Sequence, residues 1–150
     1  MNTLLYQVEP VIAIIPATMT AAAHSGQTID GTGYDRAAFV MMIGSGAGAS
    51  TMIFQISKCA TSAGTFTIAT GASFVSFSST ATVTDRCAIM DINIDPAMPW
   101  MKVVDTVGVA TLDGACLCLL YKGSDQLPVS PVNTLQAHGA VIPAKNVFLP

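Results

Sequence analysis

The stretch Arg36-Ala-Ala-Phe-Val-Met-Met-Ile-Gly44 decides the fold of this chain. It is a short apolar run, with Gly33-Tyr-Asp35 before it and the small residues Gly44–Ser50 after it. A run of this length between turn residues is typical of a β-strand and not of a helix. Successive side chains of a strand point to opposite faces of the sheet. One face therefore carries Ala37, Phe39, Met41 and Ile43, and the other carries Ala38, Val40 and Met42.

Both faces of this predicted strand are apolar, whereas a strand of an antiparallel sandwich usually has one face toward water. A second run with the same property is Gly114-Ala-Cys-Leu-Cys-Leu-Leu-Tyr121. We expect something to cover the second face of each strand, and a neighbouring subunit is the simplest cover. The residues that we assign to this subunit interface are Val40, Met42, Leu117 and Leu119.

Further short runs alternate apolar and polar residues, including Thr51–Lys58, Arg86–Ile94 and Trp100–Val107. Turn-forming residues separate such runs at intervals of roughly 8–14 residues, and the chain shows no long amphipathic helical pattern. The sequence therefore predicts an all-β fold, an antiparallel β-sandwich with the jelly roll as a candidate topology.

We expect three parts in the chain: an N-terminal arm at residues 1–27, a sandwich core at 28–123 and an extended C-terminal arm at 124–150. In the first arm a short apolar run lies between Pro10 and Pro16, and proline restricts such a run to the edge of a sheet. The last part contains prolines that keep it extended, but it is too apolar for a solvated disordered tail. We therefore expect the arms to lie against a partner through Val11, Ile12, Ile14, Ile15, Val147, Phe148 and Leu149.

The composition also favours an assembly. Hydrophobic residues make up 51% of the chain and charged residues 10%, against roughly a quarter charged in average domains. Because the chain has few groups with which to make a polar surface, we interpret it as a homo-oligomer, with a trimer favoured. A monomer coated with Ser and Thr is the alternative. The net charge is −3 and the six basic residues do not cluster, which argues against nucleic-acid binding, since phosphates demand a basic patch.

The chain shows no apolar run near the roughly eighteen residues of a membrane-spanning helix. Its start lacks the basic segment of a secretory signal. We therefore expect no membrane association, synthesis in the cytoplasm and free thiols. Cys116 and Cys118 lie two apart on one predicted strand, a poor geometry for a disulfide. We interpret both as small buried hydrophobic residues. Metal ligation by this pair and a disulfide involving Cys59 or Cys87 are the alternatives.

We expect no enzyme, no cofactor and no metal site. The two histidines, His24 and His138, lie in the predicted arms, and Glu9 is the single glutamate, so paired glutamates for acid–base chemistry are unavailable. The nucleophile motif Gly-x-Ser-x-Gly is absent from the sequence. One binding alternative is a host-glycan adhesin, in which Trp100 and Tyr34 would form an aromatic platform.

The run Gly33-Tyr-Asp-Arg-Ala-Ala-Phe-Val40 resembles an entry motif, G-Y-[DE]-S-A-x-[FV]-V, of small virion proteins of tailed phages. The resemblance covers about residues 25–130, and departs from the family at Lys58–Gly64, where an Asp-rich turn is usual, and in the length of both arms. Later segments resemble the hairpin, the aromatic-basic strand, the apolar strand and the proline-containing tail of those proteins: Ile53–Ser57, Trp100–Val104, Ala115–Tyr121 and Gln126–Val129.

This resemblance implies a structural role in the virion, as a decoration or cement protein of the head or a component near it. The major capsid protein is then the partner, and the exterior of the capsid is the location. Our first hypothesis is a sandwich that self-associates and clamps neighbouring capsid subunits. A head–tail joint or tail component is the alternative within the family, and the glycan-binding adhesin is the alternative of another class.

Overall fold

The computed structural model describes residues 8–46, 51–75, 86–122, 134–137 and 140–143. Within these residues all regular structure is β-strand, as the sequence predicts. The strands are β1 (Val8–Met19), β2 (Ala23–Asp30), β3 (Arg36–Gly46), β4 (Thr51–Cys59), β5 (Thr67–Val75), β6 (Arg86–Asn93), β7 (Trp100–Gly108), β8 (Leu112–Tyr121), β9 (Thr134–Ala137) and β10 (Ala140–Pro143).

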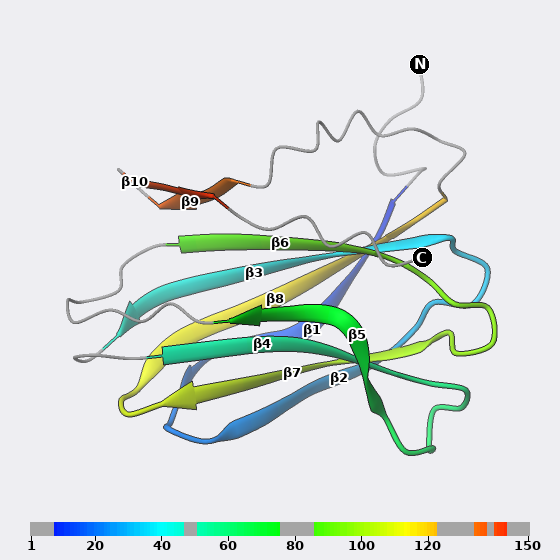
Figure 1. The fold of residues 1–150 in the computed structure, drawn as a ribbon, viewed down its shortest axis with the longest axis horizontal. Helices are drawn as coiled ribbons and strands as arrows, with labels where there is room; N and C mark the ends of the chain where they lie inside the picture. The colour runs from blue at the N-terminus through cyan, green and yellow to red at the C-terminus, as the bar shows by residue number, and fades with distance from the viewer. Residues whose placement is uncertain (1–7, 47–50, 76–85, 123–133, 138–139, 144–150) are drawn as a thin grey trace.

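The described strands form two antiparallel sheets (Figure 1). The larger sheet has the order β1-β8-β3-β6-β9-β10, and the smaller sheet has the order β2-β7-β4-β5. The first eight strands pair from the outside of the chain inward: β1 with β8, β2 with β7, β3 with β6 and β4 with β5. This is the path of one long hairpin wrapped into two sheets, the jelly roll. The predicted sandwich and its candidate topology are both confirmed.

The inner faces of the two sheets pack together to form the core. β3 lies in the middle of the larger sheet, between β8 and β6. In the smaller sheet, the side chains of β7 alternate between buried and half-buried along its whole length. The buried side chains of both sheets form one cluster, as expected for a sandwich. The β3 residues that were predicted to share the inner face are at most 2% exposed: Ala37, Phe39, Met41 and Ile43.

The turn before β3 fixes where that strand begins. The Asp30 carboxylate accepts a hydrogen bond from the Thr32 amide at 2.9 Å. Gly33 has a φ of +87°, a conformation that glycine adopts without steric cost. The chain then enters the ladder at Arg36, which pairs with β6 on one side and β8 on the other. The turn at residues 30–35 therefore leads directly into the central strand.

The predicted N-terminal arm differs from the structure. Residues 8–27 form β1 and the first part of β2, and they pair with β8 and β7 as members of the sandwich. β1 lies at the edge of its sheet, as Pro10 and Pro16 predict, because an edge strand needs amide donors on one side only. Its register with β8 shifts after Ile12 and after Ile14, so the regular alternation of faces breaks in this strand.

Of the predicted C-terminal arm, the structure describes the short hairpin β9–β10, which pairs with β6 at Arg86 and Cys87. The interface candidates Val147, Phe148 and Leu149 lie outside the described residues. Their role stays a prediction.

The two faces of β3 predict different costs for neighbouring substitutions. Phe39 is 0% exposed, so Phe39→Ala should lower the free energy of unfolding by about 3–5 kcal/mol through the lost burial and the cavity. Val40→Ala, on the half-buried outer face, is the matched control and should cost clearly less. Urea denaturation measures both values, and equal losses would contradict the assignment of the two faces.

Candidate subunit interface

The outer face of the larger sheet brings together the central interface residues that the sequence predicted. The strand register places four side chains in one row across β1, β8, β3 and β6: Ile12, Leu117, Val40 and Ile89. Neighbours in such a row lie about 4.5–5.5 Å apart at Cβ and point to the same side of the sheet. Val40 and Leu117 alternate with buried residues of their own strands, so this row faces away from the core.

Two neighbouring rows widen this apolar surface. Met42 pairs with Ala115 on β8 and with Cys87 on β6. On the other side of the central row, Ala38 pairs with Leu119. We call the combined surface the outer patch, and its members are Ile12, Ala38, Val40, Met42, Cys87, Ile89, Leu117 and Leu119.

Three large side chains of the outer patch are well exposed: Ile12 at 56%, Met42 at 46% and Ile89 at 42%. Exposed apolar residues that are scattered singly are normal on protein surfaces, but a contiguous patch marks a contact site. The outer patch is contiguous because its members are direct cross-strand neighbours on four adjacent strands. It is therefore the best candidate for an interface among the described residues.

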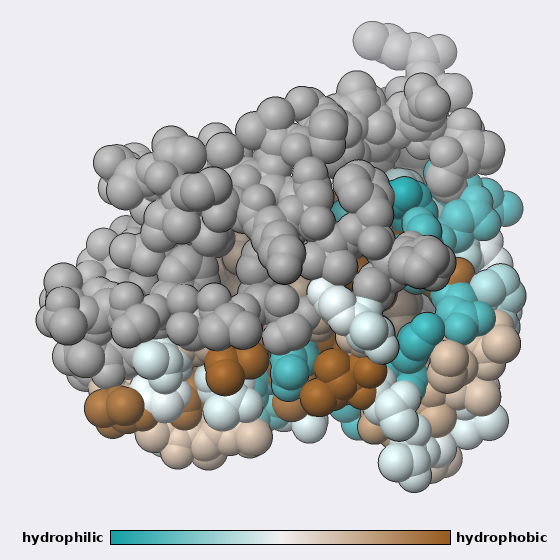
Figure 2. Space-filling view, viewed as in Figure 1, coloured by the Kyte–Doolittle hydropathy of each residue, from teal (hydrophilic) through white to brown (hydrophobic). Residues whose placement is uncertain are grey.

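The smaller sheet has a different outer face. The outward Val104 of β7 has Ser25 and Gln55 as its cross-strand neighbours, and both are polar. Ile68 and Val109 are exposed at 55% and 81%, but Ile68 lies on β5 and Val109 in the turn after β7. Figure 2 accordingly shows hydrophobic areas separated by polar ones on the described part of the face that it presents. The outer face of the larger sheet is thus more continuously apolar than that of the smaller sheet.

The four residues of β1 that were predicted to contact a partner do not all lie on the surface. Ile12 belongs to the outer patch, and Ile15 is 61% exposed. Val11 packs against the core and Ile14 is buried within it, which corrects their assignment to partner contacts. The cause is the register shift after Ile12, which leaves both Ala13 and Ile14 on the buried side.

Sequence reasoning did not include Ile89 among the interface residues. The alternation of Arg86–Ile94 already placed Ile89 on the outward side with Asp91. Its importance becomes clear only from the register, which sets Ile89 directly beside Val40. Strand order and register arise from tertiary pairing, and a single strand carries no signal for them.

One end of the outer patch is hollowed into a shallow, open groove of about 590 Å³. Met42 and Cys87 of the outer patch line it, together with Ala115 and segments of β1. At its side, the Thr18 hydroxyl donates a hydrogen bond to the Asp113 carboxylate at 2.6 Å. This groove continues the outer patch, and most of the residues that line it are apolar or glycine.

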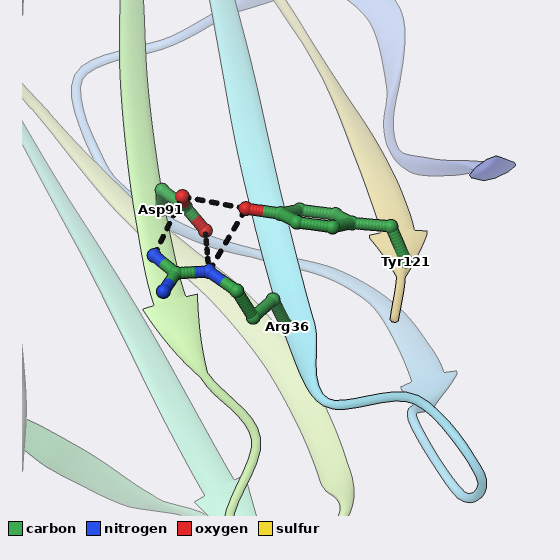
Figure 3. Close-up of polar contacts among 3 residues, drawn as sticks. All are labelled: Arg36, Asp91 and Tyr121. Carbon is green, nitrogen blue, oxygen red and sulfur yellow. Dashed lines mark hydrogen bonds and ion pairs between the residues drawn. The ribbon is translucent and has the colours of Figure 1, made fainter. Parts of the chain in front are cut away.

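The opposite end of the outer patch is a closed polar cluster (Figure 3). The Arg36 guanidinium forms an ion pair with Asp91 at 2.7 Å, and its Nε donates to the Tyr121 hydroxyl at 2.9 Å. The Tyr121 hydroxyl in turn donates to the Asp91 carboxylate at 2.6 Å. The three residues come from β3, β6 and β8, so the cluster joins the strands that carry most of the outer patch.

The surroundings of the cluster favour the neutral form of Tyr121 and the charged form of Arg36. Burial and the hydrogen bond to Asp91 raise the pKa of Tyr121 to about 12, so its phenol remains a neutral donor. The same carboxylate raises the pKa of Arg36 above its usual value. The side chains of Arg36 and Asp91 are 23% and 22% exposed, and a partly buried pair is screened less by salt than a surface pair. The apolar patch therefore ends at a rigid polar rim, an arrangement typical of protein interfaces.

The cysteines behave as buried apolar residues. Cys116 and Cys118 are buried, as predicted, Cys59 is also buried and Cys87 is half-buried. Burial raises the pKa of Cys118 to about 12 and also raises that of Cys116, which makes both thiols unreactive. Among the residues that the structure describes, no group of three His, Cys, Asp or Glu side chains is placed to hold a metal ion. That same part of the chain has no helix with the length and apolarity to cross a membrane.

The residues of the glycan alternative are both half-buried. Trp100 begins β7 and pairs with Asp30 and Cys59 on the neighbouring strands. Tyr34 packs against the core, and its hydroxyl donates a hydrogen bond to Glu9. A glycan platform made by these aromatics stays a prediction without a specific structural feature in its favour.

Comparisons with known proteins identify the fold and not a family. No protein-family model and no curated protein matches the sequence. The fold is similar to the structure of infectious bursal disease virus Gx strain, with a TM-score of 0.56 and 10% identity over 80% of this chain. It is also similar to the VP2 subviral particle of that virus, with a TM-score of 0.53 and 9% identity over 79% of this chain.

The structure of the Gt strain gives a TM-score of 0.51 and 9% identity over 80% of this chain. This chain spans about a third of the length of the chains that it resembles, from 33% to 34%. At such low identity the likeness is one of fold alone, that of a β-sandwich.

The polar cluster predicts a coupled loss of stability. Asp91→Ala should lower the free energy of unfolding by about 1–3 kcal/mol, because Arg36 and Tyr121 each lose a partner while largely out of water. Tyr121→Phe removes a single hydroxyl and should cost about 1 kcal/mol. Urea denaturation of the single variants and the double variant gives the coupling free energy, and purely additive losses would contradict a cooperative cluster.

Proposed function

We propose that this chain is a structural virion protein that self-associates and binds the exterior of a capsid, as a decoration or cement protein of the head. The observation that carries the proposal is the outer patch, a contiguous apolar surface on one sheet of a jelly roll. The fold likeness to proteins of a virus supports it, and so does the resemblance of the sequence to small phage virion proteins. A head–tail joint or tail component is the alternative position in the particle.

We assign the outer patch to contacts between copies of this chain. Its members carry no charge, and the charges at its rim are already paired, since Arg36 and Asp91 bind each other. A second copy therefore has to supply no counter-charge and can bury the patch against its own. Met42, with its flexible side chain, suits such an adaptable contact.

Burial of the outer patch between two copies can supply enough free energy for association. A standard interface buries roughly 1,600 Å² in total, and apolar area contributes about 25 cal/mol per Å². Lost translational freedom and the desolvation of polar groups offset most of that gain. A stable oligomer consequently needs a well-packed apolar centre, and the row through Leu117 and Val40 is positioned to form it.

The terminal segments are assigned to the capsid partner. Val147, Phe148 and Leu149 lie outside the described residues, and from the apolar sequence of this segment we assign them to contacts with the capsid partner. The exposed Ile15 of β1 lies outside the rows of the outer patch and remains available for a similar contact. In this arrangement the sandwich holds the copies together and the arm clamps the major capsid protein.

A charge in the outer patch should break self-association. Leu117→Glu would bury an unpaired carboxylate in the interface and should weaken association at least about a hundredfold. Val104→Glu on the smaller sheet is the matched control, because Val104 is also half-buried and outward-facing but lies among polar neighbours. Sedimentation equilibrium measures both constants. Equal effects of the two variants, or no effect of either, would rule out the outer patch as the interface.

Removal of the C-terminal arm should separate folding from capsid binding. A chain that lacks residues 128–150 should retain the cooperative unfolding of the sandwich, because β1 to β8 form the sandwich core and β9 adds to the edge of β6, where its ladder pairs Ala137 with Arg86 and Gln136 with Cys87. It should bind purified heads more weakly in a co-sedimentation assay. If the shortened chain binds heads with full affinity, the arm has no part in capsid binding.

A further inference from the structure

The core of the sandwich contains a carboxyl group, that of Asp105. This residue lies on the inner face of β7 between Val103 and Val107, and it is 0% exposed. Neither of its carboxylate oxygens has a hydrogen-bond partner among the described residues. An ionised carboxylate in such a place is very unfavourable, because it loses its hydration and gains neither a hydrogen bond nor a counter-ion.

The surroundings of Asp105 do not compensate a negative charge. Its direct cross-strand neighbours are His24 on β2 and Phe54 on β4. The His24 ring is engaged through Nε2 with the Thr20 carbonyl at 2.9 Å. From β8, on the opposite sheet, the titratable group near Asp105 is the buried Cys116. The inward side chains of β4 and of the nearby part of β1 are apolar.

Among these groups, only His24 can carry a positive charge, and it shifts the pKa of Asp105 less than burial does. Burial raises the pKa of the Asp105 carboxyl, and this shift exceeds the opposing effects of a positively charged His24 and of the backbone amide of Asp105 itself. The neutral carboxylic acid is therefore the form that the folded core favours.

We propose that Asp105 makes the stability of the sandwich depend on pH, because its carboxyl holds a proton in the folded chain and releases that proton on unfolding. The inference rests on the geometry of the core and is independent of any role in a virion. A rise in pH should destabilise β2 first, because β2 is an edge strand whose one paired neighbour among the described strands is β7. Acid then tightens the β2–β7 edge of the sandwich, and a rise in pH loosens it.

The sign of the effect follows from the protons bound in each state. An unfolded aspartate has a pKa of about 3.9, and the folded value for Asp105 is higher. Between these two values the folded chain binds one proton more than the unfolded chain, so stability falls as the pH rises. The unfolding equilibrium constant should increase by up to about tenfold per pH unit in this window and level off above it.

Other carboxylates do not obscure this window. Asp30 and Asp95 have pKa values lowered by their hydrogen bonds, so their contribution to stability is lost only as the pH falls below the ordinary range of aspartate. A fall in stability above about pH 4 therefore has Asp105 as its source among these three groups.

The test compares the full chain with two variants by urea denaturation from about pH 4 to about pH 8. Asp105→Asn is nearly isosteric and cannot ionise, so its unfolding constant should lack the rise of up to about tenfold per pH unit. Asp30→Asn, which removes an exposed carboxylate, is the control and should keep the dependence of the unmodified chain. An unchanged pH dependence in Asp105→Asn would overturn the proposal.

A second measurement needs no variant. The ¹³C chemical shift of the Asp105 carboxyl in the unmodified chain reports its protonation directly by NMR. A protonated shift above about pH 5, where an ordinary aspartate is already ionised, is the expected result. An ionised shift in the folded protein at that pH would overturn the proposal, even if Asp105→Asn failed to fold.

Discussion

The structure depends on two adjacent strands, β3 and β8, that are apolar on both faces and lie side by side in the middle of the larger sheet. Their inner side chains interlock with the smaller sheet and make the core. Their outer side chains have no place in that core, because successive residues of a strand point in opposite directions. An isolated sandwich presents them to water, so the same sequence that builds the core also builds the apolar surface that we propose as a contact surface.

The few charges of the chain are placed in keeping with this division. Arg36 and Asp91 form an ion pair at the rim of the outer patch. Lys58 and Asp95 form a second ion pair outside the outer patch, with 3.3 Å between the Lys58 Nζ and a carboxylate oxygen of Asp95. The outer face of the smaller sheet carries polar residues such as Gln55 around its apolar ones. The outer face of the larger sheet is therefore the more continuously apolar of the two, in keeping with the proposed contact. Asp105 is the exception, a polar group inside the core.

The sequence was sufficient for the fold class and for the faces of the regular strands. The alternation around Phe39 and along Trp100–Val107 predicts which side chains are buried, because the period of a strand is fixed. It also placed Val40 and Leu117 outward. What it could not supply was that these two residues are direct neighbours, since strand order and register are decided by pairing between distant parts of the chain.

The errors have equally physical causes. Residues 1–27 were expected to form an arm, but the described part of this segment forms β1 and the beginning of β2 within the sandwich. The prolines of β1 correctly predicted its position at the edge of the sheet. Irregular register in β1 moved Ile14 into the core against the expected alternation. The burial of Asp105 could not be expected from its residue type, and it follows from its position in the middle of β7, where its side chain lies between the sheets.

The mass of the unmodified chain in solution, measured by light scattering over a range of concentrations, tests the central claim most directly. A chain of 15.5 kDa whose outer patch is covered by another copy should have a mass that is a stable multiple of this value, with a trimer as the expected state. A monomer that persists at the highest concentration would contradict the account, because the outer patch would then be stable in water without a partner.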